Sequence, residues 1–551
     1  MSSLWGLWVS SSKDSKGSAH LVRRAEGVSD PLSPARRSGA DAGRGGLAVL
    51  GAKIFFILAG LIQQTLLPRA IGLASYGALS RVLALSNILN NVVVASSTQG
   101  VSRAVARCIG AEKKTLRTTF GVHAALALVL GLGFAAIGPS LASFEGAAYI
   151  ARPLLCMSFV LLFYGLYAPI IGLLNGRQQF VRQAFLDVTF AVLRTFGLLG
   201  AGRWFVLQGG SGVLGSALGF ALASAVIVPL AAVFAFGRSK PSFLSSQRPD
   251  PVPLDTVNAA KATQWSSYLA ELGPLAAVQF FTNLLMQIDI TLLGHFLSRG
   301  GDAKSADEWV AVYRACQLFA FLPYQLLLSV TQVLFPLLAR AMAEGDREAI
   351  RRYVERGTRL ALIACGTLVT VIVALPSQLL ALAYRQDVAD RGAATLGILA
   401  LGQGAYALLA IATTVLASLG RERLSALITV GAALAVVAGC VLLVESSSFG
   451  ASELRAAATG TSIAMVLALL VAGIAVRRVA GAFIRISSVT RVVFALAVVA
   501  AMARVAPIHA GPVSTVLLAS MVAAGFLAVL VVTRELTKSD AEALRSVRRA
   551  P

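Results

Sequence analysis

Long apolar stretches separated by short charged connections make up most of this chain. A helix needs roughly 20 apolar residues to cross the hydrocarbon core of a bilayer. About fourteen stretches reach this length, and we expect each of them to be a membrane-spanning helix. The expected spans are residues 47–67, 80–100, 118–139, 153–174, 184–205, 212–236, 272–297, 309–338, 359–383, 393–418, 424–444, 456–476, 489–506 and 513–533.

The composition agrees with this pattern. Hydrophobic residues make up 57% of the 551 positions, charged residues make up 13%, and the mean hydropathy is +0.76. A soluble chain of this length does not need so much apolar surface. The sequence therefore predicts an all-α integral membrane protein.

The positions of the cations explain the formal net charge of +22. Cytoplasmic connections of membrane proteins are enriched in Lys and Arg. If the chain starts in the cytoplasm, its inner segments hold 36 of the Lys and Arg residues, its outer connections hold 10, and Arg194 and Arg314 lie within spans. We therefore expect both termini in the cytoplasm and an attraction to anionic membrane lipids, with no nucleic-acid partner.

Two short motifs occur twice in the same order. Residues 96–107 read SSTQGVSRAVAR and residues 329–340 read SVTQVLFPLLAR, at the ends of the second and eighth spans. LLNGRQQ follows the fourth span and ASLGRER follows the tenth. These echoes predict two six-helix units that enter the membrane from the same side, as in duplicated transporters that rock about a central site.

The predicted organisation has six parts. The longest polar connection lies between the sixth and seventh spans and separates the two units. The expected parts are a disordered basic cytoplasmic tail (1–46), an N-terminal six-helix unit (47–237), a cytoplasmic linker (238–265), a C-terminal six-helix unit (266–477), two additional helices (478–534) and a cytoplasmic tail (535–551).

Several segments resemble one transporter family. They are LLPRAIGLASYGALS (66–80), QIDITLLGHFL (287–297), VAVYRACQL (310–318) and VLFPLLAR (333–340), together with the Gly-Arg turns. In order and spacing, from about residue 47 to 533, they resemble the polysaccharide flippases of the multidrug/oligosaccharidyl-lipid/polysaccharide exporter superfamily.

This resemblance implies transport across a bacterial cytoplasmic membrane by alternating access. The implied substrate is an undecaprenyl-pyrophosphate-linked oligosaccharide, which moves from the inner to the outer leaflet for polysaccharide biosynthesis. Other polysaccharide-assembly membrane proteins are the partners that such a role implies.

Motifs for catalysis, metals or cofactors are missing or weak. The sequence has no GxxxxGK[ST] phosphate-binding loop. GSGVLG at 210–215 fits GxGxxG, but it opens an apolar span, so close helix packing through Gly215 and Gly219 is the better interpretation. The His and Cys residues have no ligand spacing. We therefore expect no catalytic residue, no metal site and no cofactor apart from a coupling Na⁺ or H⁺.

Cations within or beside the spans are candidate ligands for an anionic substrate. A charge in the middle of a span is costly, and a guanidinium pairs with phosphate through two hydrogen bonds. Arg194 lies near the middle of the fifth span, with Asp187 two turns earlier as an ion-pair partner or a second coupling site. Arg314 could instead snorkel to the interface, and Arg69 and Arg81 could be interface anchors.

Asp289 in the seventh span is the main candidate for coupling Na⁺ or H⁺ transport to substrate movement. It lies at about the depth of Arg314, so a salt bridge between these two residues is the alternative. Asn87, Asn91 and Gln287 could line a polar cavity between the units, or they could hydrogen-bond between helices.

These features favour a lipid-linked oligosaccharide flippase. The related alternatives are a cation-coupled multidrug exporter and a flippase for peptidoglycan lipid precursors. A membrane glycan polymerase or ligase is the alternative from another class. It would need a large outer surface, but the longest outer connection is SRGGDAKSADEW at 298–309.

Overall fold

The computed structural model describes residues 34–107, 112–237, 264–505 and 511–536. In these residues every regular element is a helix, which confirms the predicted all-α class. The predicted tail at 1–33 and most of the predicted linker lie outside the described residues.

The helices follow one another with short turns. They are α2 (Pro34–Ile71), α3 (Leu73–Arg107), α4 (Glu112–Phe144), η3 (Ala148–Ile150), α5 (Ala151–Gly176), α6 (Phe180–Phe196), the π-helical η4 (Gly197–Ala201), α7 (Gly202–Leu207), α8 (Gly212–Phe236), α9 (Trp265–Gly300), α10 (Ala303–Ala320), α11 (Leu322–Ala343), α12 (Arg347–Ala374), α13 (Pro376–Ala383), α14 (Gln386–Ser418), α15 (Glu422–Val444), α16 (Ala451–Ala480), α17 (Ile486–Val505) and α18 (Pro512–Val532).

The first helix begins earlier than its apolar stretch. Residues 34–46, which the sequence analysis assigns to a disordered tail, are helical. Pro34 stands at the first helical position, where its missing N–H costs nothing, and the Ala and Arg residues that follow are good helix formers. That part of the prediction was wrong.

Among the described residues, thirteen helical segments are long and apolar enough to cross a membrane. The remaining expected span, 309–338, corresponds to α10 and α11, which are separate helices joined at Phe321. Proline at the start of α11 favours this break, since its ring cannot continue a preceding helix. The same effect divides the expected span 359–383, where Pro376 starts α13.

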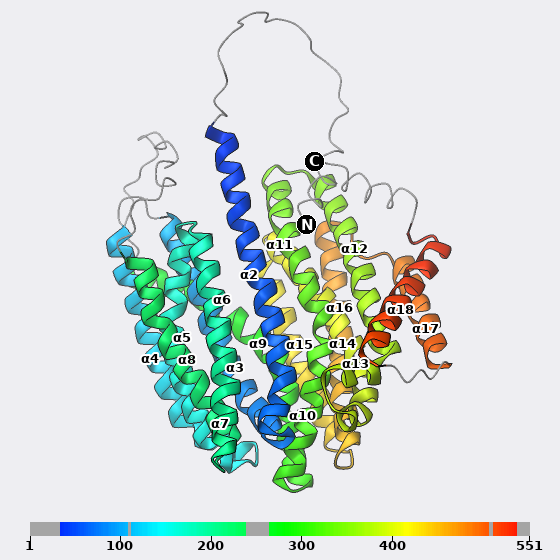
Figure 1. Ribbon diagram of the computed structural model, residues 1–551. Coiled ribbons are helices and arrows are strands. Elements are labelled where there is room, and N and C mark those ends of the chain that lie inside the picture. Colours follow the sequence, from blue (N-terminus) through cyan, green and yellow to red (C-terminus); the bar gives the residue numbers. More distant parts are fainter. Residues whose placement is uncertain (1–33, 108–111, 238–263, 506–510, 537–551) are drawn as a thin grey trace, which may run out of the picture.

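The helices form two groups with α2 between them at the front of the view (Figure 1). Helices α3 to α8 lie on one side and α10 to α16 on the other, and α9 runs between them beside α3 and α15. We call α3 to α8 the N-terminal unit and α9 to α16 the C-terminal unit. Helices α17 and α18 lie at the outer edge and pack against α12.

A buried carboxylate joins the last two helices to the C-terminal unit. Glu535 accepts hydrogen bonds from Arg359 of α12 (3.0 Å) and from Ser488 of α17 (2.8 Å), and it pairs with Arg491 (3.1 Å). Glu535 lies beyond the end of α18, outside the membrane spans. Burial raises its pKa, but the hydrogen bonds from Ser488, Arg359 and Arg491 outweigh burial, so the pKa is lowered overall.

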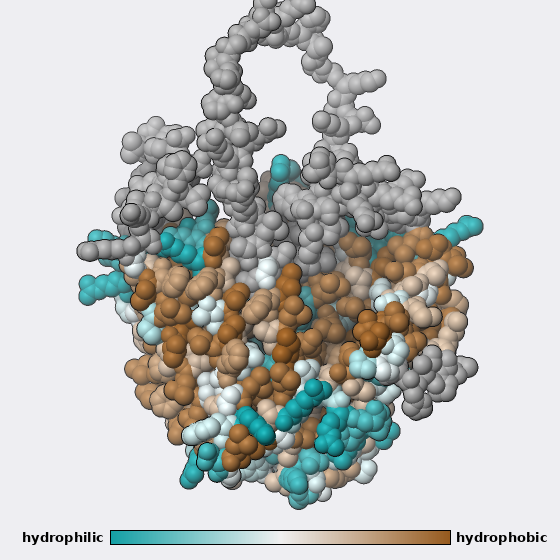
Figure 2. Space-filling model, viewed as in Figure 1, coloured by the Kyte–Doolittle hydropathy of each residue, from teal (hydrophilic) through white to brown (hydrophobic). Residues whose placement is uncertain are grey.

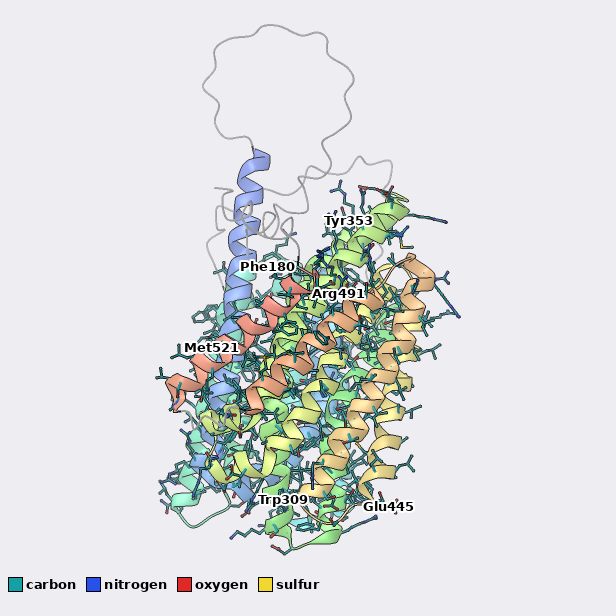
Figure 3. The ribbon with its side chains drawn as sticks, turned by 90° about the vertical axis from the view of Figure 1, so that its right-hand side faces the viewer. Phe180, Trp309, Tyr353, Glu445, Arg491 and Met521 are labelled. Atoms are coloured by element: carbon teal, nitrogen blue, oxygen red, sulfur yellow. The ribbon has the colours of Figure 1, made fainter. Side chains whose placement is uncertain are left out.

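The molecule has two polar faces, one at each end of its helices. The terminal face is the one at which α2 begins and α18 ends, and Tyr353 lies near it (Figure 3). The opposite face carries Trp309 and Glu445. Between them runs an apolar belt with polar patches at both ends (Figure 2), as expected for a protein surrounded by lipid.

The repeated motifs occupy related places. Residues 96–107 end α3, and residues 329–340 lie in the last part of α11. Gly176 ends α5, and Gly420 lies in the turn between α14 and α15 with φ +72°, a conformation that favours glycine. Both turns lie at the terminal face.

Close helix packing through the glycines of α8 is confirmed. A Cβ atom on Gly219 would lie 1.9 Å from the carbonyl oxygen of Gly197, and one on Gly215 would lie 2.6 Å from that of Ala201. Only residues without larger side chains allow α8 and the π-helical turn to approach so closely.

Candidate functional site

A buried ionic cluster joins the two units near the opposite face. Arg81 of α3 is fully buried, and its Nε lies 3.0 Å from a carboxylate oxygen of Asp307 in α10. Its Nη1 donates to Ser298 of α9 (2.7 Å) and lies 3.7 Å from the carboxylate of Glu145, which follows α4. Tyr149 donates to Asp307. One cation thus connects carboxylates from both units.

The backbones of α3 and α10 meet beside this cluster. A Cβ atom on Gly77 would lie 1.8 Å from the carbonyl oxygen of Asp307, so only glycine fits there. This contact leaves no room for a substrate between the two helices at the opposite face.

A second link joins α2 and α3 to the C-terminal unit. Arg69 donates to the carbonyl oxygen of Ala383 at the end of α13 (3.2 Å). Tyr76 donates to Gln64 (2.8 Å), and its ring centroid lies 6.4 Å from that of Tyr384. The ionic cluster and this link together close the opposite face between the units.

Helices α10 and α11, which together correspond to one expected span, pack against different neighbours. Helix α10 packs against α3 of the N-terminal unit. The helices packed against α11, which continues toward the terminal face, are α12 and α14 of its own unit. The units therefore meet along α10 and diverge along α11.

Helix α9 is the other connection between the units. At its start, Tyr268 contacts His123 of α4 (2.7 Å), and Glu271 pairs with Arg107 of α3 (3.0 Å). Further along, Asn91 of α3 donates to Asn283 of α9 (2.9 Å). Helix α9 thus follows α3 on one side of the molecule and packs against α15 of its own unit.

Asp289 lies in a buried polar network inside the C-terminal unit. Its carboxylate accepts hydrogen bonds from the hydroxyl of Tyr313 (2.8 Å), the amide of Gln317 (3.1 Å to each oxygen) and the backbone N–H of Ile290 (2.8 Å). The structure does not contain the direct salt bridge between Asp289 and Arg314 that was the expected alternative. Gln317 lies between the two residues, and its side-chain oxygen accepts a hydrogen bond from Arg314 (3.0 Å).

Arg314 connects this network to the surface between the units. Its side chain is half-buried, and it interacts electrostatically with the phenol groups of Tyr76 and Tyr384 in the second inter-unit link. Hydrogen bonds therefore run from Asp289 through Gln317 to Arg314, whose charge in turn acts on the tyrosines where the units meet.

Arg194 and Asp187 lie in a different place, within the N-terminal unit. The guanidinium of Arg194 lies over the ring of Phe220 in α8, 4.9 Å from its centroid, and its Nε is buried with no hydrogen-bond partner in the part of the chain that the structure describes. Asp187 interacts electrostatically with Tyr164 and Tyr167 of α5. The structure thus separates these two candidates from Asp289 and Arg314.

The three candidate amides have different surroundings. Asn91 forms the inter-unit hydrogen bond described above, and Asn87 is half-buried on the same helix. Gln287 is 7% exposed, and its side-chain oxygen has no hydrogen-bond partner among the described residues.

The sequence analysis missed Glu145, Asp307 and Gln317. Glu145 lies in a turn outside the spans, where burial raises its pKa to about 8; nearby Arg81 lowers it and Asp307 raises it. The sequence pattern that could have identified Glu145 is a single carboxylate between two apolar stretches. Arg81 and Arg69, predicted as substrate ligands, are engaged by partners in this conformation, so that role stays a prediction.

Comparison with known proteins supports the architecture. Residues 274–442 match the MatE family model. No curated protein sequence matches the chain. The structure is similar to the lipid II flippase MurJ in an inward closed conformation, with a TM-score of 0.66 and 14% identity over 88% of this chain and 98% of MurJ.

Two further solved structures show the same arrangement. One is a multidrug resistance MATE family transporter of the MOP superfamily, inward-facing, with a TM-score of 0.60 and 15% identity over 79% of this chain and 98% of the other. The second is a MOP superfamily transporter from Pyrococcus furiosus, described as having a binding pocket of reverse polarity. Its TM-score is 0.55, with 17% identity over 79% of this chain and 95% of the other. The predicted resemblance is confirmed at the level of the fold: this chain has the fold of the multidrug/oligosaccharidyl-lipid/polysaccharide exporter superfamily, with a MatE segment at residues 274–442.

Proposed function

We propose that this protein is a flippase that moves a lipid-linked oligosaccharide across the membrane by alternating access. The supporting observation is that the units are joined through Arg81 and Asp307 at the opposite face and diverge along α11, while α9 connects them along one side of the molecule. The positive-inside rule assigns the terminal face to the cytoplasm. The conformation described here would then receive substrate from the inner leaflet.

The substrate we propose carries a pyrophosphate. Arg194 and Arg314 are the arginines farthest from the ends of the expected spans, and a guanidinium binds phosphate oxygens through two hydrogen bonds. An arginine in a low-dielectric environment would attract an anionic headgroup while the polyprenyl chain stays in lipid. MurJ, which shares this fold, is itself named a lipid II flippase.

Coupling to Na⁺ or H⁺ would act through Asp289. A cation bound to its carboxylate would compete with the hydrogen bonds from Gln317, and Gln317 also holds Arg314 at the surface between the units. Cation binding would therefore neutralise the charge of Asp289 and change the position of Arg314. Asp187 in the N-terminal unit is the second candidate for this role.

Reconstituted protein tests the proposal. Proteoliposomes are loaded with a short-chain polyprenyl-pyrophosphate oligosaccharide, and a glycosidase outside measures how much substrate becomes accessible. Arg194→Ala should reduce flipping by at least tenfold, and Arg194→Lys should keep part of it, since it retains the charge without the planar fork. Arg203→Gln, at an exposed position on α7, is the matched control.

Two outcomes would contradict the substrate role of Arg194. One is full flipping by Arg194→Ala at normal protein level. The other is full flipping by the double variant Asp187→Asn, Arg194→Ala, which would identify the two residues as a structural pair. Reporter fusions after Arg534 test the orientation, and they should be cytoplasmic.

The family-model match favours one alternative, a cation-coupled multidrug exporter. The same proteoliposomes would then expel a fluorescent organic cation when a Na⁺ or H⁺ gradient is imposed, and they would not flip the oligosaccharide lipid. Lipid II in place of the oligosaccharide lipid tests the third candidate, the peptidoglycan-precursor flippase.

A further inference from the structure

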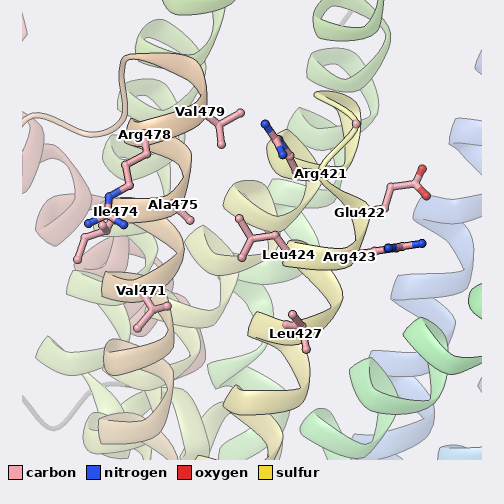
Figure 4. Close-up of a pocket in the computed structure, with 11 residues that line it drawn as sticks. Arg421, Glu422, Arg423, Leu424, Leu427, Val471, Ile474, Ala475, Arg478 and Val479 are labelled. Carbon is pink, nitrogen blue, oxygen red and sulfur yellow. The ribbon is translucent and has the colours of Figure 1, made fainter.

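A groove of about 840 Å³ opens between the start of α15 and the end of α16 (Figure 4). Arg421 and Arg478 lie at its end nearest the terminal face, one on each wall. Leu427 and Val471 lie at its other end, deeper toward the middle of the membrane. The groove therefore has a cationic end and an apolar end.

The apolar end faces outward from the unit. Leu427 is 68% exposed, and Val471 and Ile474 are each 56% exposed. Helices α15 and α16 bury their other faces against each other and against α9 and α14. In a membrane, the exposed wall would contact acyl chains.

The cationic end has no internal counterion in the part of the chain that the structure describes. No hydrogen bond or ion pair there engages the side chain of Arg421 or Arg478, and both residues are exposed. The carboxylate of Glu422 points away from the groove (Figure 4). The first backbone N–H groups of α15, beside Arg421, add to the positive potential.

We propose that this groove binds one anionic phospholipid of the inner leaflet. Its phosphate would lie between Arg421 and Arg478, and an acyl chain would follow Leu427 and Val471. A guanidinium pairs well with phosphate, and the cytoplasmic leaflet is rich in anionic lipids. A lipid fits better than a free phosphate because the apolar wall continues directly from the cationic end.

This site does not depend on the proposed transport activity. Its walls are α15, α16 and the turn before α15, all within one unit. The contacts between the units involve α2, α3, α4, α9, α10 and α13 instead. Loss of lipid binding and loss of flipping can therefore be measured separately.

Native mass spectrometry of the delipidated full-length protein in detergent tests the site. Phosphatidylglycerol is titrated into the wild type and into Arg421→Gln, Arg478→Gln, and we expect the first lipid to bind at least tenfold more weakly to the variant. Arg351→Gln, Arg352→Gln removes the same charge from exposed positions on α12 at the same face and should bind like the wild type. Thermal unfolding confirms that both variants are folded.

Other lipids and anions complete the test. Phosphatidylcholine should bind the wild type as weakly as phosphatidylglycerol binds the double variant, and excess inorganic phosphate should not displace phosphatidylglycerol. Leu427→Ala, Ile474→Ala should weaken binding with both arginines intact. Equal phosphatidylglycerol binding by the wild type and the arginine variant would overturn the proposal. So would equal binding of phosphatidylcholine, or displacement by phosphate.

Discussion

Replacing Glu145 with glutamine should remove most of the pH dependence of the contact between the two units at the opposite face. Glu145 lies in the turn after α4, fully buried beside Arg81 and Asp307. Burial raises its pKa from 4.5 to about 8. At neutral pH the closed conformation therefore holds a proton on this carboxyl.

The magnitude follows from proton linkage. When the units separate, Glu145 meets water and regains its usual pKa, so closing takes up nearly one proton between about pH 5 and pH 8. The ratio of closed to open protein then falls roughly tenfold for each pH unit, which is about 1.4 kcal/mol. The sign is definite: acid favours the closed opposite face, and raising the pH through this window favours opening.

Distances between spin labels can follow this equilibrium. Labels at Gln208 and Ser446 would report from exposed positions on the two units at the opposite face, in a variant without other cysteines. Glu145→Gln mimics the protonated carboxyl, so its distance distribution should stay closed from pH 5.5 to 7.5. Glu445→Gln, an exposed carboxylate on the same face, should keep the wild-type slope.

One neighbour must be measured in parallel. His295 stacks on Phe144 with ring centroids 4.3 Å apart, beside Glu145, so its replacement serves as a second control. The double variant Glu145→Gln, His295→Gln separates the two contributions. An unchanged pH slope in Glu145→Gln, or opening as the pH falls in the wild type, would refute the reasoning.

Three other perturbations have definite outcomes. Gly219→Leu should destabilise the protein by at least about 1–3 kcal/mol in thermal unfolding, since no space separates it from Gly197, whereas Gly200→Ala, with open space around it, should be neutral. Asp289→Asn should impair transport and abolish its dependence on Na⁺ or pH; full activity with the dependence intact would exclude coupling there. Glu535→Gln should loosen α17 and α18, seen as faster hydrogen exchange, and acidification below the lowered pKa of Glu535 should do the same to the wild type; slow exchange in both would contradict the tether.

Local features of the sequence predicted much of the fold. The spans depend on runs of apolar residues, and the packing of Gly219 depends on the spacing of small residues within one helix, so both can be seen in a short stretch. The break between α10 and α11 was missed because the apolar stretch continues through Phe321 and Pro323. Its only local signal was the proline.

The candidate site was less predictable because its contacts join distant parts of the chain. Arg81 was found as an unusual cation, but its partners Glu145 and Asp307 come from other helices, and nothing in the local pattern pairs them. Asp289 and Arg314 lie at similar depth, which suggested a salt bridge. Gln317, one turn beyond Arg314, takes the place between them, and only side-chain packing decides that.

The charged helix α10 has a consequence for how the protein is made. Helix α10 carries Asp307 in its first turns, at the outer edge of its expected span, and Arg314 within that span. A charge near the centre of a span costs about 2.5–3.5 kcal/mol, and a buried carboxylate near its end also needs a counterion. The cation that neutralises Asp307 is Arg81, which belongs to α3 and is synthesised much earlier. The N-terminal unit therefore supplies a counterion that is already in the bilayer when α10 leaves the ribosome. Synthesised alone, the C-terminal unit would leave Asp307 without this counterion, so the order of the two units along the chain is also an order of assembly.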